Sequence, residues 1–277
     1  MRAEVRALQQ AGLRVGVVPT MGALHEGHLS LVRLAKQPCD KVVATIFVNP
    51  TQFAPTEDFN RYPRTLDDDL RLLHQAGCEY VFVPSQAEVY PPGFSTHIEP
   101  PAVARRWEGE CRPGHFRGVC TVVLKLLNMV PADVAIFGRK DYQQAAVIKQ
   151  LVRDLNVATH IEIGDTVRDP DGMAMSSRNR YLSATERERA LAISQSLRAA
   201  QQLIDAGERR AATIAGLIGE TLQPKMDTID YVAIADGETL EPIETITANT
   251  VILIAARIGN TRLIDNCLVS PAHLRTR

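Results

Sequence analysis

Short apolar runs alternate with amphipathic segments over the first part of the chain. Runs of four to eight residues predict buried strands at 13–18, 41–48, 79–83, 132–137 and 160–163. Apolar residues at helical spacing predict helices at 29–36, 65–76, 119–129 and 142–155. Because strands alternate with helices of this length, we expect right-handed crossovers and a parallel sheet.

The pattern changes after Thr166. A long helix is predicted at 184–206, opened by the capping box S-A-T-E at 183–186, and a shorter helix at 211–222. Three further segments predict strands, at 230–235, 251–258 and 262–266. We therefore expect an α/β fold with a Rossmann-like parallel-sheet domain over residues 1–166 and a smaller C-terminal α+β domain over residues 167–277.

Composition limits the classes of function. The longest apolar run in the C-terminal part, VILIAA at 251–256, is too short to span a bilayer, and the N-terminus lacks the apolar core of a signal peptide. Five scattered cysteines argue against a disulfide framework and favour the cytosol. A net charge of −1 without a basic run argues against nucleic acid, so we expect a small-molecule partner and no membrane association.

The most informative stretch is PTMGALHEGH at 19–28, directly after the first predicted strand. Gly22 opens a turn into a helix, whose free N–H groups and dipole favour an anion. His25 and His28 are three residues apart and share one helix face, so both can reach a bound phosphate. Two alternatives are a surface turn that happens to contain histidines and a metal pair, but the pair lacks a third ligand at a recognisable distance.

Six motifs together extend over nearly the whole length of the chain. They are PTMGALHEGH at 19–28, FVNPTQF at 47–53, YPRTLDDD at 62–69, RPGHFRGV at 112–119, FGRKDYQQ at 137–144 and MSSRNRYLS at 175–183. In these motifs the chain resembles the pantothenate synthetase family, which belongs to the nucleotidyltransferase superfamily related to class I aminoacyl-tRNA synthetases.

The resemblance implies an ATP-dependent condensation of pantoate with β-alanine through a pantoyl adenylate, with release of pyrophosphate and then AMP. It also implies Mg²⁺, held largely by the ATP phosphates and without a dedicated protein ligand, and a cytoplasmic homodimer. The C-terminal domain would act as a lid.

The resemblance also assigns the site residues. The catalytic residues would be His25, His28, Lys140, Ser176, Ser177 and Arg178. The nucleotide would be bound by Met21, Gly22, Ala23, Leu24, His25, Glu26, Gly27, His28, Gly138, Arg139, Lys140, Asp141, Val167, Met175, Ser176, Ser177 and Arg178. Pantoate would be bound by Gln52 and Gln144, whose amides donate and accept hydrogen bonds and so suit its hydroxyls and carboxylate.

Other polar residues have open roles. Arg112 and His115 either hold phosphates and close the site or have a structural role, and Asp68 and Asp69 are expected to orient Mg²⁺ indirectly. The chain departs from the family pattern in two ways: it begins closer to the histidine motif, so a short leading strand is expected to be missing, and Asp165 replaces a proline that fixes φ.

Three rival functions remain at this stage. One is a nucleotidyltransferase that moves AMP onto a phosphorylated acceptor, and Gln52 and Gln144 argue against it because they are not basic. The others are a silent nucleotide-binding protein and an RNA-binding fragment of synthetase type. A binder would not need the charge-stabilising set of His25, His28, Lys140 and Arg178.

Overall fold

The structure is a computed structural model, and it describes residues 1–55 and 57–269. The chain forms two compact units. The first unit comprises Met1–Arg139 and Gln144–Thr166, and the second comprises Lys140–Gln143 and the described residues from Val167 onward.

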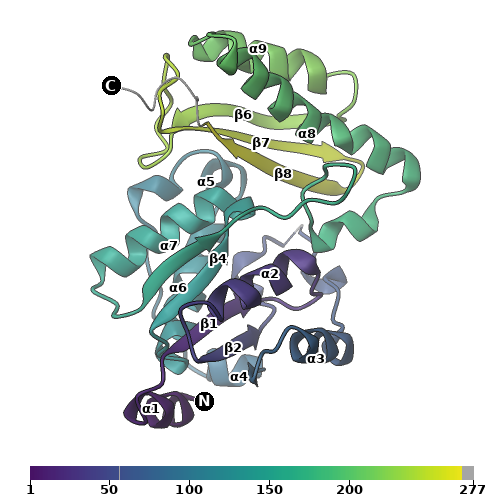
Figure 1. Ribbon diagram of the computed structural model, residues 1–277. Coiled ribbons are helices and arrows are strands. Elements are labelled where there is room, and N and C mark those ends of the chain that lie inside the picture. The colour runs from purple at the N-terminus through teal and green to yellow at the C-terminus, as the bar shows by residue number, and fades with distance from the viewer. Residues whose placement is uncertain (56, 270–277) are drawn as a thin grey trace. The chain divides into compact units, whose positions relative to one another are not determined.

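A five-stranded sheet forms the centre of the first unit (Figure 1). Its strands are β1 (Val15–Thr20), β2 (Lys41–Ile46), β3 (Tyr80–Phe82), β4 (Val134–Gly138) and β5 (His160–Gly164). Their order is β3-β2-β1-β4-β5, and every neighbouring pair is parallel. The parallel sheet predicted from the apolar runs is therefore confirmed.

Both faces of this sheet are buried, which explains why its strands are continuous apolar runs. Successive side chains point to opposite faces: Val17 joins one core cluster and Val18 joins another. Helices also contribute to both clusters. They are α1 (Arg2–Gln10), α6 (His115–Met129) and α7 (Tyr142–Asp154) in the first cluster, and α2 (Glu26–Ala35) and α3 (Leu66–Gln75) in the second.

Two helices of the first unit begin earlier than predicted, α2 at Glu26 and α6 at His115. Their first turns contain glycine and polar residues, which hide the helical spacing of apolar positions. The long segment at 84–118, which connects β3 to α6, contains short helices. Those in this segment are α4 (Gln86–Val89), η3 (Ala102–Ala104) and α5 (Glu108–Cys111). Other short helices lie elsewhere: η1 (Pro50–Gln52), η2 (Phe59–Arg61) and η4 (Arg139–Asp141).

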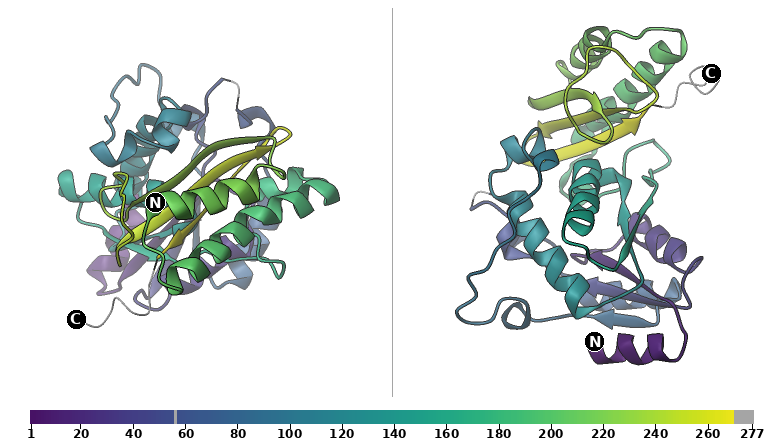
Figure 2. Two further views of the ribbon diagram at one scale, coloured as in Figure 1. Left: turned by 90° about the horizontal axis from the view of Figure 1, so that it is seen from above. Right: turned by 90° about the vertical axis from the view of Figure 1, so that its left-hand side faces the viewer.

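The second unit has a three-stranded antiparallel sheet in the order β6-β7-β8. Its strands are β6 (Thr228–Asp236), β7 (Thr250–Ile258) and β8 (Thr261–Leu268), and its helices are α8 (Ala184–Asp205), α9 (Ala211–Leu222) and the short η5 (Ser177–Tyr181). Helices α8 and α9 lie together on one face of the sheet (Figures 1 and 2). The α+β architecture predicted for this part is confirmed.

The predicted capping box at the start of α8 is also present. The Ser183 hydroxyl accepts a hydrogen bond from the Glu186 N–H at 3.3 Å, and the Glu186 carboxylate accepts one from the Ser183 N–H at 2.8 Å. Across residues 1–55 and 57–269, every helix is too short or too polar to cross a bilayer.

Gly118 allows helix α6 to pack directly against the turn that follows β2. A Cβ atom at this position would lie 2.3 Å from the carbonyl oxygen of Thr51 and 2.8 Å from the Cα of Gln52, and both are backbone atoms. We predict that Gly118→Ala destabilises the protein by about 1–3 kcal/mol, measured by urea unfolding, because the backbone must shift.

Gly216 is the matched control, since it lies inside α9 and a Cβ there would contact nothing within 4 Å. Gly216→Ala should stabilise the protein by about 0.5–1 kcal/mol through helix propensity. Equal effects of the two substitutions would contradict the close approach at Gly118.

Candidate active site

Three adjacent strands of the first unit end at the same edge of the sheet, and candidate residues follow each of them. The histidine turn follows β1, Gln52 lies in η1 after β2, and Gly138 is the last residue of β4. The strand order reverses between β1 and β4, and open α/β sheets bind ligands at such a switch point. The fold therefore brings the histidine turn and the end of β4 together at the expected edge.

A buried carboxylate holds the histidine turn. Asp69 is 1% exposed, and its two oxygens accept hydrogen bonds from the N–H groups of Ala23 (3.0 Å) and Leu24 (2.8 Å). Gly22 and Ala23 both have a positive φ, at 78° and 51°. A Cβ at Gly22 would lie 2.9 Å from the Asp69 carboxylate, so a larger residue would disturb this contact. The turn is thus shaped by glycine and fixed by Asp69.

The two histidines lie at the start of α2. His25 is the N-cap residue, and its N–H faces Nδ1 of His28 at 3.3 Å. Because Nδ1 of His28 accepts this hydrogen bond, a neutral His28 carries its proton on Nε2. The two rings are adjacent, with centroids 4.1 Å apart. The helix terminus and the donor on His28 are suited to binding an anion such as a phosphate group.

The neighbouring Glu26 is more exposed than His25 and forms an ion pair with Arg33.

The side chain of Gln52 is fixed by two contacts. Its side-chain oxygen accepts a hydrogen bond from the Asn49 amide at 3.1 Å. Its amide nitrogen lies 3.1 Å from the sulfur of Met21. The amide orientation of Gln52 is therefore set by its protein neighbours, with the donor directed toward the histidine turn.

Asp165, the residue that departs from the family pattern, contacts the turn after β4. The Asp165 side chain is 82% exposed and forms an ion pair with Arg139, and the two residues follow the neighbouring strands β5 and β4. The aspartate that stands in place of proline thus contacts another candidate residue. Gln144 is the third residue of α7 and is partly buried.

Two polar contacts of the second unit fix the segment that contains Lys140 and Asp141. The Asn266 amide donates to the carbonyl oxygen of Lys140 at 2.8 Å, and the Tyr142 hydroxyl donates to the carbonyl oxygen of Gly237 at 2.9 Å. The backbone that presents the Lys140 ammonium group is therefore anchored within this unit.

The other candidates of the second unit lie on and after a tight hairpin. Val167 and Met175 are joined by a backbone hydrogen bond of 3.0 Å. Ser176 then caps η5, accepting a hydrogen bond from the Arg178 N–H at 3.3 Å. This brings Ser176, Ser177 and Arg178 together at the first turn of η5.

Ion pairs fix that hairpin. The Arg168 guanidinium contacts both carboxylate oxygens of Asp265, at 2.7 and 3.0 Å, and Asp265 is 4% exposed. Arg187 donates to Asp169 at 2.7 Å and to Asp171 at 2.8 Å. The hairpin that precedes η5 is therefore held by charge-assisted hydrogen bonds within its own unit.

Sequence reasoning missed the structural roles of Asn49 and Asp69. Asp69 was expected to orient Mg²⁺ together with Asp68, yet it binds the backbone of the histidine turn, while the Asp68 side chain is 68% exposed and pairs with Arg71. One signal was available: Asp69 lies four residues before the buried Leu73, on the apolar face of α3. Residues 1–55 and 57–269 contain no group of three or more His, Cys, Asp or Glu suited to a metal ion.

Comparison with known proteins identifies the family of the chain. A family model described as pantoate–β-alanine ligase matches residues 1–268. The pantothenate synthetase of Rhodopirellula baltica is 52% identical over 269 residues, which cover 96% of this chain and 95% of the relative. The chain belongs to the pantoate–β-alanine ligase family.

Solved structures of this family match nearly the whole chain. The crystal structure of pantothenate synthetase from Thermus thermophilus is 42% identical, with a TM-score of 0.91, and 98% of each chain is covered. A pantoate–β-alanine ligase from Francisella tularensis, complexed with β-γ ATP and β-alanine, is 36% identical, with a TM-score of 0.78 and coverage of 96% of this chain and 95% of that one.

We predict that Asp69→Asn lowers the free energy of unfolding by about 1–3 kcal/mol, because an amide accepts through one oxygen and leaves one buried N–H unpaired. It should also lower kcat/KM about tenfold or more, since the histidine turn would move. Urea unfolding and steady-state kinetics measure the two effects. The neighbouring Asp68→Asn is the control and should change stability by less than about 0.5 kcal/mol; equal effects at both positions would contradict the role of Asp69.

Proposed function

We propose that the protein condenses pantoate with β-alanine in two steps at the carboxyl edge of the parallel sheet. ATP first reacts with the pantoate carboxylate to give pantoyl adenylate and pyrophosphate, and β-alanine then displaces AMP. The observation that carries this proposal is the histidine turn at the start of α2, next to the end of β4 at the switch point. The match to the pantoate–β-alanine ligase family over residues 1–268 supports it.

The first step needs positioning and positive charge rather than a base. The pantoate carboxylate is ionised at neutral pH, because carboxyl pKa values lie near ~4. Its attack on the α-phosphorus increases negative charge on the phosphate oxygens, which fixed donors stabilise. We assign this stabilisation to the start of α2 and to His28, which carries its proton on Nε2 because its Nδ1 accepts the His25 N–H.

Further cationic and hydroxyl groups would hold the nucleotide. We assign Lys140 and Arg178 to the phosphates and Ser176 and Ser177 to the same region. A guanidinium can contact two phosphate oxygens at once, which suits Arg178 to a leaving pyrophosphate. The remaining residues assigned by the resemblance would line the nucleotide: Met21, Gly22, Ala23, Leu24, His25, Glu26, Gly27, Gly138, Arg139, Asp141, Val167 and Met175.

Pantoate would be held by Gln52 and Gln144. The Gln52 amide oxygen already accepts from Asn49, so its N–H groups are the part directed toward the histidine turn. An N–H donor suits a carboxylate or hydroxyl oxygen of pantoate. In the second step the β-alanine amine must be unprotonated to attack the acyl carbon, and its proton leaves to a phosphate oxygen, because the Nδ1 lone pair of His28 already accepts the His25 N–H.

Three properties of the protein stay predictions from the sequence: a homodimer, residence in the cytoplasm and dependence on Mg²⁺. Magnesium in such sites is held mainly by the phosphates of the nucleotide with several waters. The described carboxylates form no cluster for it, and Asp69 is committed to the backbone, so we assign no protein ligand.

The two-step reaction predicts an exchange that needs no amine. Labelled pyrophosphate should enter ATP when the enzyme, Mg²⁺ and pantoate are present and β-alanine is absent. His28→Ala should slow this exchange by about 10²–10³, because it removes a donor to charge that develops in the transition state, while ATP still binds in a calorimetric titration.

Other outcomes of the exchange experiment would contradict the proposal. Exchange that required β-alanine would exclude a separate adenylate step. Exchange driven by a phosphorylated acceptor and not by pantoate would favour the rival transferase, and an absence of exchange with any acid would favour a silent nucleotide-binding protein.

A further inference from the structure

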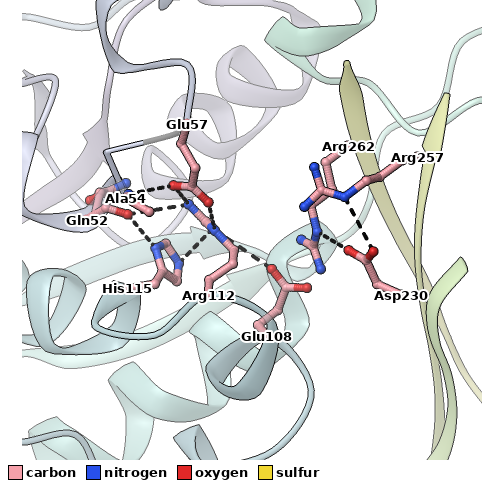
Figure 3. A network of polar contacts seen from close by, with 9 residues as sticks. All are labelled: Gln52, Ala54, Glu57, Glu108, Arg112, His115, Asp230, Arg257 and Arg262. Atoms are coloured by element: carbon pink, nitrogen blue, oxygen red, sulfur yellow. Dashed lines mark hydrogen bonds and ion pairs between the residues drawn. The ribbon is translucent and has the colours of Figure 1, made fainter. Parts of the chain in front are cut away.

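Two side chains contact the backbone carbonyl oxygen of Gln52, and a third binds one of them (Figure 3). Nδ1 of His115 lies 2.9 Å from this oxygen, and Nη2 of Arg112 lies 3.4 Å from it. Arg112 is bound in turn by both carboxylate oxygens of Glu57, at 2.6 and 2.9 Å. Glu57, Arg112 and His115 thus form one network, which we term the Gln52 clamp.

The hydrogen bonds define the protonation of the clamp. A carbonyl oxygen can only accept, so Nδ1 of His115 carries the proton, and Nε2 accepts from Nη1 of Arg112 at 3.1 Å. Burial, together with the Arg112 charge, lowers the pKa of His115 to about 4, so the ring is neutral at physiological pH. Burial works to raise the pKa of Glu57, but hydrogen bonds and charge from Arg112 outweigh it and lower that pKa to about 2.

Arg112 has little capacity left for a phosphate. Its three nitrogens contact Glu57, His115 and the Gln52 carbonyl, and Nη1 also lies 3.9 Å from the carboxylate of Glu108. The charge of Arg112 is therefore balanced inside the protein. Of the two roles that the sequence left open for Arg112 and His115, phosphate binding or a structural role, this arrangement favours the structural one.

The side chain of Gln52 is fixed by a second set of contacts. The Gln52 side-chain oxygen accepts from Asn49, and the Asn49 side-chain oxygen accepts from the Tyr90 hydroxyl at 2.8 Å. The clamp fixes the backbone of Gln52, and Asn49 fixes its amide. Both are needed to aim the Gln52 N–H groups, because rotation of either the backbone or the side chain would turn them away.

We infer that Arg112 and His115 are positioning residues, which hold the Gln52 carbonyl so that the Gln52 amide meets the hydroxy-acid substrate in one fixed orientation. This inference rests on the proposed function, in which Gln52 binds pantoate. Arg112 and His115 act through Gln52 and do not contact the nucleotide. Loss of the clamp should therefore weaken pantoate binding selectively.

The test is the effect of His115→Leu on the two substrates. Leucine removes both ring nitrogens of His115, so the KM for pantoate should rise about tenfold or more, because a small misplacement of a binding group has a large effect. The KM for ATP should change by less than about twofold, because His115→Leu alters none of the residues assigned to ATP.

Two further variants separate positioning from general damage to the fold. His115→Asn retains a nitrogen on Cγ, as Nδ1 is in histidine, so it can still donate to the Gln52 carbonyl and should recover much of the loss. Val123→Ala is the control for stability. Val123 lies on the same helix, α6, is 5% exposed and belongs to the first core cluster, but it makes no polar contact with the clamp. Both KM values should stay near wild type in this variant.

Each remaining outcome counts against the inference. An unchanged KM for pantoate in a folded His115→Leu protein would overturn it, and so would equal increases of both KM values in His115→Leu and Val123→Ala. If His115→Leu does not fold, Arg112→Lys provides the same test, because lysine lacks the fork that contacts Glu57 and His115. Failure of the proposed function is distinguishable, since wild-type enzyme would then show no pyrophosphate exchange with pantoate.

Discussion

The buried carboxylate of Asp69 is the contact on which the rest of the proposed site depends. It accepts hydrogen bonds from the N–H groups of Ala23 and Leu24, which lie in the tight turn after β1. A buried N–H without a partner is costly, so the turn keeps this shape while Asp69 is present. The turn determines where α2 begins, and the start of α2 carries His25 and His28.

A similar principle applies one strand away, where the backbone of Gln52 is fixed by the Gln52 clamp. In both places a residue distant in sequence contacts the backbone of a turn after a parallel strand. The turns after β1 and β2 are therefore rigid parts of the first unit, although they are loops. Rigid presentation of donors at a strand edge is what a reaction driven by positioning and charge requires.

Much of the fold could be predicted from the sequence, because the sheet is buried on both faces and its strands are uninterrupted apolar runs. The starts of α2 and α6 were predicted too late, since Glu26, Gly27 and His115 do not extend the apolar spacing of these helices. The contacts of Asp69 and His115 could not be predicted in the same way. They join residues 45 and 63 positions apart, and only the folded chain brings such pairs together.

The central claim is that this strand edge brings a carboxylate to the α-phosphorus of ATP. Pantoate labelled with ¹⁸O at both carboxylate oxygens tests it directly, with mass spectrometry of the products after complete reaction with β-alanine. One labelled oxygen should appear in the phosphate group of AMP, because the bond from carbon to that oxygen breaks when the amine attacks, and the other should remain in the amide. Label in pyrophosphate or orthophosphate, or AMP without label, would contradict the account.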